Sequence, residues 1–121
     1  MENIKKYYIS IIIPVCDNPV LFQTVVSTVL NQTKNNVEMV VVDGSKKEFL
    51  DINKQHIRLF NEERIKHIIK QDGKGFSGAT ETGIKEATGE FIVLLYNKEQ
   101  WQADEEKNGF LDKFVTKIKG D

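Results

Sequence analysis

The chain has 121 residues, of which 40% are hydrophobic and 29% are charged, a composition typical of one globular domain. Seventeen Lys and Arg residues are balanced by 18 Asp and Glu residues, so we expect no nucleic-acid partner. A single cysteine cannot form an internal disulfide, and no apolar segment is long enough for a membrane span or a signal peptide. These features predict one cytoplasmic domain over residues 1–121, without a transmembrane segment.

The chain opens with a predicted strand and helix. Residues 7–15 are almost continuously apolar and rich in β-branched side chains, which favours a strand buried on both faces of a sheet. Asp17 or Asn18 can cap a helix that begins at Pro19. Apolar residues recur at helical spacing from there to Asn31. Together these residues predict one complete βα unit.

The same pattern repeats along the chain. Residues 37–42 predict a second buried strand, and apolar residues between positions 49 and 60 mark one face of a second helix. A shorter strand at residues 65–69 is followed by a loop at 71–78 and a third helix. The predicted buried face of that helix consists of small and apolar residues: Ala79, Gly83, Ile84 and Ala87.

The last part of the chain predicts one more strand and helix. Gly89 is a candidate helix stop, residues 91–95 predict a fourth buried strand, and residues 110–118 predict a terminal helix. Strands alternating with helices imply an α/β fold whose sheet is mostly parallel and carries helices on both faces. Ligands of such sheets bind at the carboxyl ends of the strands. The candidate loops are therefore residues 16–18, 43–47, 71–78 and 96–100.

Asp43 ends the second strand, where its carboxylate could accept hydrogen bonds from a nucleobase or a ribose hydroxyl. The alternative is an aspartate that caps its own turn. Cys16 lies in the first candidate loop, but the spacing gives neither His56 nor His67 a reason to approach it. We therefore interpret Cys16 as a small apolar residue, and two isolated histidines predict no metal site.

Residues 73–78 match the glycine pattern of dinucleotide-binding loops through Gly73, Gly75 and Gly78, and Glu99 follows near the end of the next strand. That pattern normally closes the first strand–helix unit, whereas here it closes the third. A dinucleotide-binding module is therefore one hypothesis. Its alternative is a set of glycines that shape the loop.

Several runs, in order and at matching separations, resemble the family 2 glycosyltransferases, whose nucleotide-sugar-binding half has the GT-A fold. The runs are IIIPVCD (residues 11–17), LNQT (30–33), EMVVVDGS (38–45) followed by Glu48, and a glycine-containing stretch at 72–90. The resemblance covers nearly the whole chain. It implies a GT-A-like, Rossmann-like domain that binds a nucleotide-diphosphate sugar and serves its transfer to a glycan or a lipid-linked acceptor.

The resemblance also implies which residues bind the nucleotide sugar: Pro14, Asp17, Asp43, Glu48, Asp72 and Gly75. Members of the family hold a divalent cation with an Asp-x-Asp motif after the fourth strand. This chain has Tyr96, Lys98 and Glu99 at the corresponding positions, so an ammonium group replaces a carboxylate. We therefore expect no metal cofactor, and Mn²⁺ or Mg²⁺ only if the altered motif still binds it.

Two further departures limit the expected activity. Cys16 stands where the family has a stacking aromatic residue, and the acceptor-binding half that supplies the catalytic base is missing. The sequence therefore predicts a truncated or degenerate glycosyltransferase domain that binds its nucleotide weakly and turns over weakly or not at all. The alternative is a non-catalytic remnant of a polysaccharide pathway. Such a remnant would bind another protein chain or have a regulatory role.

Overall fold

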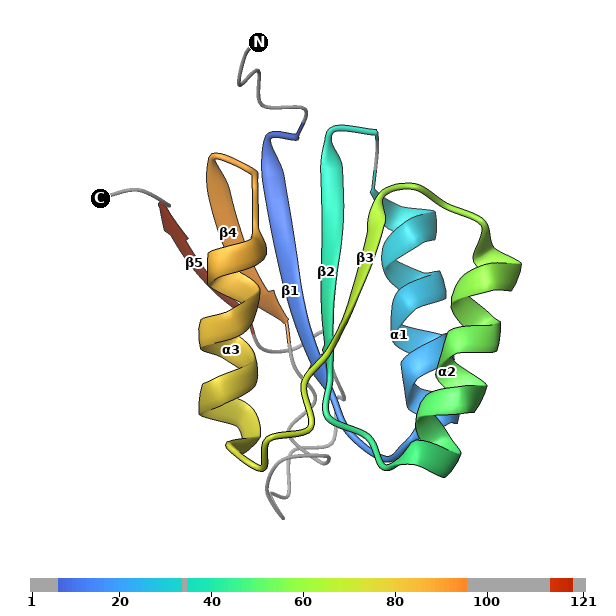
Figure 1. Ribbon diagram of the computed structural model, residues 1–121. Coiled ribbons are helices and arrows are strands. Elements are labelled where there is room, and N and C mark those ends of the chain that lie inside the picture. The colour runs from blue at the N-terminus through green and yellow to red at the C-terminus, as the bar shows by residue number, and fades with distance from the viewer. Residues whose placement is uncertain (1–6, 34, 96–113, 119–121) are drawn as a thin grey trace, which may run out of the picture.

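The computed structural model describes residues 7–33 and 35–95 and the backbone of 114–118. These residues form a five-stranded sheet in the order β3-β2-β1-β4-β5, with three helices (Figure 1). The elements are β1 (Ile9–Val15), α1 (Pro19–Gln32), β2 (Val37–Asp43), α2 (Lys47–Phe60), β3 (Ile65–Ile69), α3 (Gly75–Glu86), β4 (Phe91–Leu95) and β5 (Phe114–Ile118). None of the described helices is long and apolar enough to cross a bilayer.

The four strands predicted from the sequence are parallel to one another, and β5 pairs antiparallel with β4. The prediction of a terminal helix over residues 110–118 is therefore wrong for its last five positions. Phe114, Val115, Thr116 and Ile118 have high strand propensity, and their apolar spacing fits a short strand as well as a helix. Pairing with β4 also satisfies backbone groups that an open sheet edge would expose.

The helices cover both faces of the sheet, as the sequence predicts, with α1 and α2 on one face and α3 on the other (Figure 1). Residues alternate between these faces along each strand. Ile13 and Val41 pack with Phe22 of α1, whereas Ile12 and Val40 pack with small residues of α3. This double burial explains why the strands appear in the sequence as continuous apolar runs.

Two predicted helix boundaries differ from the observed ones. Helix α3 begins at Gly75, inside the predicted loop, and it ends at Glu86 with Ala87 as its cap. Gly89 therefore does not stop the helix. A Cβ atom at Gly89 would lie 2.8 Å from the backbone nitrogen of Ser10, so this glycine lets the turn before β4 approach β1.

Asp17 and Asn18, in the first strand–helix turn, have different roles. The Asn18 side chain caps α1, because its Oδ1 accepts a hydrogen bond of 3.0 Å from the Leu21 backbone nitrogen. Asp17 instead adopts a left-handed backbone conformation with φ of 53°. Its side chain is thereby available to contact the neighbouring loop.

Candidate functional site

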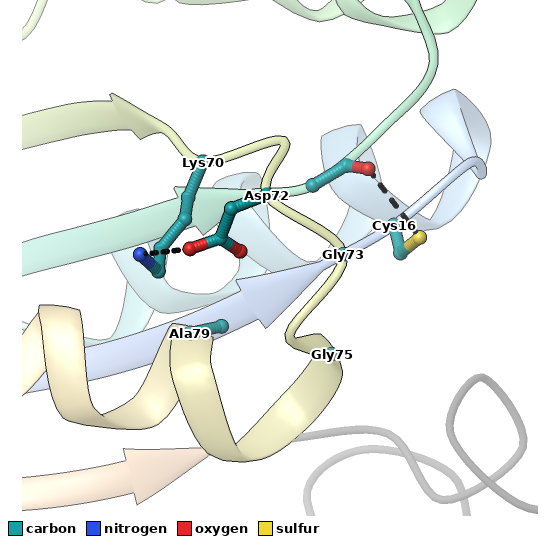
Figure 2. A pocket seen from close by; sticks show the side chains of 7 residues that line it. Cys16, Lys70, Asp72, Gly73, Gly75 and Ala79 are labelled. Atoms are coloured by element: carbon teal, nitrogen blue, oxygen red, sulfur yellow. Dashed lines mark hydrogen bonds and ion pairs between the residues drawn. The ribbon is translucent and has the colours of Figure 1, made fainter.

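A pocket of about 160 Å³ lies at the carboxyl ends of the strands, between three strand-end loops and the start of α3 (Figure 2). We call it the rim pocket, and it is lined by Cys16, Gly44, Lys70, Asp72, Gly73, Gly75 and Ala79. The structure thus brings together three of the four predicted loops, and the fourth lies outside the described residues. The volume is below the roughly 300–1,000 Å³ typical of sites for drug-sized ligands, so these residues would enclose only part of a nucleotide sugar.

Backbone rather than side chains forms much of the pocket wall. Gly73 and Gly75 have φ angles of +77° and +65°, a region that other residues rarely adopt. A Cβ atom at either position would meet no atom within 4 Å, so the requirement is conformational and not steric. A Cβ atom at Gly44 would lie 3.3 Å from the Lys70 carbonyl oxygen, so the absence of a side chain at Gly44 lets the second and third loops lie close together.

An ion pair lies beside these glycines. Lys70 Nζ is 2.6 Å from Asp72 Oδ2 (Figure 2). Asp72 Oδ1 accepts a 3.0 Å hydrogen bond from the Lys74 backbone nitrogen. The bond from Lys70, followed by that from Lys74, lowers the pKa of the Asp72 carboxyl. Asp72 is therefore ionised at neutral pH, so the pocket offers an anionic acceptor next to an ammonium donor.

Cys16 borders the same pocket but lacks the setting of a nucleophile. Burial, followed by the charges of Asp17 and Asp43, raises the pKa of its thiol. The thiol therefore stays protonated at neutral pH, and its Sγ lies 3.7 Å from the Gly44 carbonyl oxygen. A reactive cysteine needs a lowered pKa, so the structure agrees with the interpretation of Cys16 as a small packing residue.

Asp43 lies beneath the rim pocket, not in its lining. Its side chain is fully buried, with Oδ1 accepting from the Ser45 backbone nitrogen at 2.9 Å. Its Oδ2 lies 2.9 Å from Asn53 Nδ2 and 2.8 Å from His67 Nε2. The predicted alternative, an aspartate that caps its own turn, is therefore present, and the carboxylate is turned away from the crevice. We call Asp43, Ser45, Asn53 and His67 the Asp43 network.

Burial alone would raise the pKa of Asp43, but the hydrogen bonds from His67, Ser45 and Asn53 outweigh it and lower the pKa. The buried group is thus a carboxylate at neutral pH. Such a charge is stable in the interior only when donors surround it, and the network supplies three.

Ser45 joins the Asp43 network to the other loops. Its Oγ accepts a 2.8 Å hydrogen bond from the Asp17 backbone nitrogen, and Asp17 Oδ1 in turn accepts a 2.7 Å bond from the Lys46 nitrogen. The Ser45 carbonyl oxygen accepts a 2.6 Å bond from Gln71 Nε2. One buried serine therefore connects the loops that follow β1, β2 and β3.

The remaining predicted site residues lie in different settings. Pro14 is buried in β1 opposite Val42, beyond the last residue of β1 that pairs with β4. Glu48 is exposed in the first turn of α2 and does not line the rim pocket. Tyr96, Lys98 and Glu99 lie outside the described residues. Within the described part of the chain, no group of three His, Cys, Asp or Glu side chains could hold a metal ion.

Four residues that organise the site were not predicted to do so from the sequence: Ser45, Asn53, His67 and Gln71. Ser45 had a detectable signal, since a serine two residues after a turn aspartate often completes the turn. His67 had none, because its contact with Asp43 depends on how β3 is aligned with β2. In that register His67 pairs with Val41, which precedes Asp43 by two positions and so lies on the same face.

The family model described as "Glycosyl transferase family 2" matches residues 10–105 of this chain. The Escherichia coli protein named UDP-Glc:alpha-D-GlcNAc-diphosphoundecaprenol β-1,3-glucosyltransferase WfgD is 33% identical over 98 residues. That match covers 81% of this chain and 38% of the relative. A Campylobacter jejuni glucosyltransferase, named for an acceptor linked to PP-undecaprenol, is 27% identical and matches 72% of this chain and 28% of its own length. The chain thus spans well under half the length of these relatives.

Solved structures show the same fold. The mannosyltransferase PcManGT of Pyrobaculum calidifontis, solved with GDP-Man and Mn²⁺, superposes with a TM-score of 0.65 at 19% identity. It covers 84% of this chain and 34% of that protein. TarS of S. aureus superposes with a TM-score of 0.56 at 23% identity, covering 74% of this chain and 27% of TarS. The sheet order, the helices on both faces and these superpositions identify the fold as GT-A-like.

Proposed function

Because this chain belongs to glycosyl transferase family 2, we propose that the rim pocket is part of a site for the nucleotide diphosphate of a sugar donor. The observation that carries the proposal is the convergence of three strand-end loops on one pocket at the carboxyl ends of the parallel strands. This is where α/β sheets of this kind bind their ligands.

In this proposal the residues that line the pocket contact the nucleotide. The Asp72 carboxylate accepts hydrogen bonds from a base or a ribose hydroxyl, and Lys70 supplies positive charge for a phosphate oxygen. Gly73 and Gly75 let the ligand approach the backbone closely. Because the pocket is small, the rest of the donor would extend beyond it.

The other predicted residues do not line the pocket and would act on the nucleotide only indirectly. Asp17 and Asp43 hold the loops in place through Ser45, and Pro14 lies one residue before the end of the strand that leads into the first loop. Glu48 makes no part of the pocket wall, and we assign it only an outer position at the start of α2. Of the two acids Asp43 and Asp72 that the resemblance implies, we therefore assign direct contact with the nucleotide to Asp72 alone.

For the whole protein we propose transfer of a sugar from a nucleotide-diphosphate donor to a glycan or lipid-linked acceptor. An acceptor hydroxyl would attack the anomeric carbon, the bond from that carbon to the phosphate oxygen would break, and the nucleoside diphosphate would leave. Among the described residues we assign no base for the hydroxyl proton and no metal ligands. For this chain by itself we therefore propose donor binding in the cytoplasm with little or no turnover.

Thermal-shift and calorimetric titrations with UDP and GDP test this proposal. We expect either nucleotide at millimolar concentration to raise the melting temperature, and Asp72→Asn to remove most of the shift. Glu81→Gln, in an exposed part of α3 outside the pocket, is the matched control and should bind as the parent chain does. Titrations with and without Mn²⁺ show whether the motif that contains Lys98 binds a cation.

Two other outcomes would select the alternatives. A melting temperature unchanged by either nucleotide would contradict donor binding and favour a non-catalytic remnant that binds another protein chain. A shift produced by NAD and abolished by Gly75→Val would instead favour the dinucleotide-binding module, with Gly73, Gly75 and Gly78 as its glycines.

A further inference from the structure

A histidine and an asparagine meet the Asp43 carboxylate in the interior, below the rim pocket. His67 comes from β3 and Asn53 from α2, and each places a nitrogen within 3 Å of Asp43 Oδ2. The His67 side chain is 8% exposed and Asn53 is fully buried. The ring of Phe22 in α1 packs against the His67 ring, with ring centroids 5.5 Å apart. Side chains from β3 and α2 therefore converge on one acid, and α1 packs against the histidine.

The hydrogen-bonding roles in this cluster follow from the charge of Asp43. An ionised carboxylate only accepts hydrogen bonds, so His67 Nε2 must carry a proton and donate it. Asn53 must likewise present its amide nitrogen, and this nitrogen is also 3.5 Å from Ser45 Oγ. Both side chains are thus fixed in one orientation by the acid that they contact.

From Asp43 the hydrogen bonds continue outward to the pocket. Asp43 Oδ1 accepts from the Ser45 nitrogen, and Ser45 Oγ accepts from the Asp17 nitrogen. The Asp43 carbonyl oxygen accepts a 2.8 Å bond from the nitrogen of Lys70, a pocket-lining residue. A displacement of Asp43 would therefore disturb Ser45, which holds the first loop, and Lys70, which lines the rim pocket.

We propose that His67 and Asn53 are positioning residues for the nucleotide site, which hold the Asp43 carboxylate so that Ser45 and the three loops keep the shape of the rim pocket. The inference deepens the donor-binding function proposed above and, for its effect on affinity, rests on it. Neither side chain lines the pocket, so each acts only through the residues between it and the ligand.

The competing explanation is that these residues stabilise the fold and nothing else. A second buried carboxylate, Glu38, provides the matched control at the opposite end of the sheet. Its Oε2 accepts a 2.6 Å hydrogen bond from Ser10 Oγ, and both residues are at least 98% buried. Ser10→Ala therefore removes one donor from a buried carboxylate, as His67→Phe does, but far from the pocket.

The test compares His67→Phe, His67→Gln and Ser10→Ala. Phenylalanine keeps the volume of the ring but donates no hydrogen bond, whereas the glutamine amide places a donor close to the position of Nε2. We expect the dissociation constant for UDP or GDP to rise about tenfold in His67→Phe. In His67→Gln and Ser10→Ala it should stay within about twofold of the parent value.

Amide hydrogen exchange provides a readout that needs no ligand. The backbone amides of Asp17 and Lys46 should exchange at least about tenfold faster in His67→Phe and keep their parent rates in Ser10→Ala. Asn53→Leu provides a second variant if His67→Phe does not fold, and the same two amides should exchange faster in it. A parent chain that binds neither nucleotide would contradict the proposed function, while the exchange rates would still decide the positioning role.

Unchanged exchange at Asp17 and Lys46 in a folded His67→Phe or Asn53→Leu chain would overturn the inference. So would equal losses of affinity in His67→Phe and Ser10→Ala, since these would show that any loss of stability weakens binding.

Discussion

The two ends of the sheet use similar buried chemistry for different purposes. At the carboxyl end, Asp43 faces α2 and accepts hydrogen bonds from the turn after its own strand, from a helix and from a neighbouring strand. At the amino end, Glu38 faces α3 and accepts from Ser10 and from the Thr88 backbone nitrogen at 2.7 Å. The first acid lies beneath a pocket, whereas the second lies where Gly89 closes tightly on β1.

The difference between the ends lies in what the surrounding backbone permits. Near Glu38, a Cβ atom on Gly89 would overlap Ser10, so the chain there is packed without space for a ligand. Near Asp43, the glycines at 73 and 75 have positive φ angles and open space around them. One buried carboxylate, Glu38, thus lies at a closed end of the sheet. The other, Asp43, lies beneath an open site at the opposite end.

Asp43→Ala should destabilise the chain more than any other change considered below. This change leaves donors of Ser45, Asn53 and His67 buried without their acceptor, so we expect the free energy of unfolding to fall by about 3–5 kcal/mol. Urea denaturation measures the change. A loss below about 1 kcal/mol would show that water or rearranged partners replace the carboxylate. Asp43 would then not be the buried, fully bonded acid that the comparison with Glu38 requires.

Gly89→Ala tests the closed end and should be the next most severe change. The new Cβ atom would lie 2.7 Å from Ser10 Oγ and 2.8 Å from two backbone atoms, so strand β1 or the turn must shift. We expect a loss of about 2–3 kcal/mol in the free energy of unfolding, with nucleotide affinity unchanged once the chain is folded. A weakened nucleotide affinity with little loss of stability would indicate that the ligand binds at the amino end of the sheet, contrary to the proposed site.

Gly75→Ala provides the matched change at the open end. No atom obstructs the new methyl group, so only the positive φ angle of 65° opposes it, and we expect a loss of about 1 kcal/mol. Because Gly75 lines the rim pocket, the dissociation constant for a nucleoside diphosphate should nevertheless rise. Gly89→Ala should therefore lose more stability than Gly75→Ala, whereas Gly75→Ala should lose more nucleotide affinity, and calorimetry measures both. If one variant lost more of both, the division between the two ends of the sheet would be contradicted.

The smallest effect is a dependence on pH. The hydrogen bonds of the folded state hold the pKa of Asp43 below its unfolded value of about 3.9, so ionised Asp43 contributes stability above that pH. The contribution is lost as the pH falls through the lower folded-state pKa. The stability difference between the parent chain and Asp43→Asn should thus narrow as the pH falls below about 4. A difference that narrows between pH 7 and 5 would show that the pKa is raised instead.

Most of the fold could be predicted from the sequence, since buried parallel strands leave continuous apolar runs and the helices leave a clear spacing. The terminal segment was wrong because a short apolar stripe fits a helix or a strand, and its pairing with β4 is a tertiary effect. Gly89 was misinterpreted because its role is to permit close approach to Ser10, and a distant contact leaves no mark beside it in the sequence.

The candidate site could be predicted less completely than the fold. The strand-end rule located three of its loops, and Asp72 and Gly75 line the pocket as expected. The orientation of Asp43 could not be foreseen, because a residue at a strand end can turn toward either the crevice or the interior. Which one occurs here depends on His67 and Asn53, whose positions follow from strand register and helix packing. The roles of Tyr96, Lys98 and Glu99 stay predictions.

Amide chemical-shift mapping by NMR during titration with UDP or GDP locates the nucleotide site directly. We expect saturable shifts at residues 16–18, 44–46 and 70–75, and none at residues 87–90 around the Glu38 carboxylate. Shifts that concentrate at residues 87–90, or the absence of any saturable shift, would contradict a nucleotide site at the carboxyl ends of the strands.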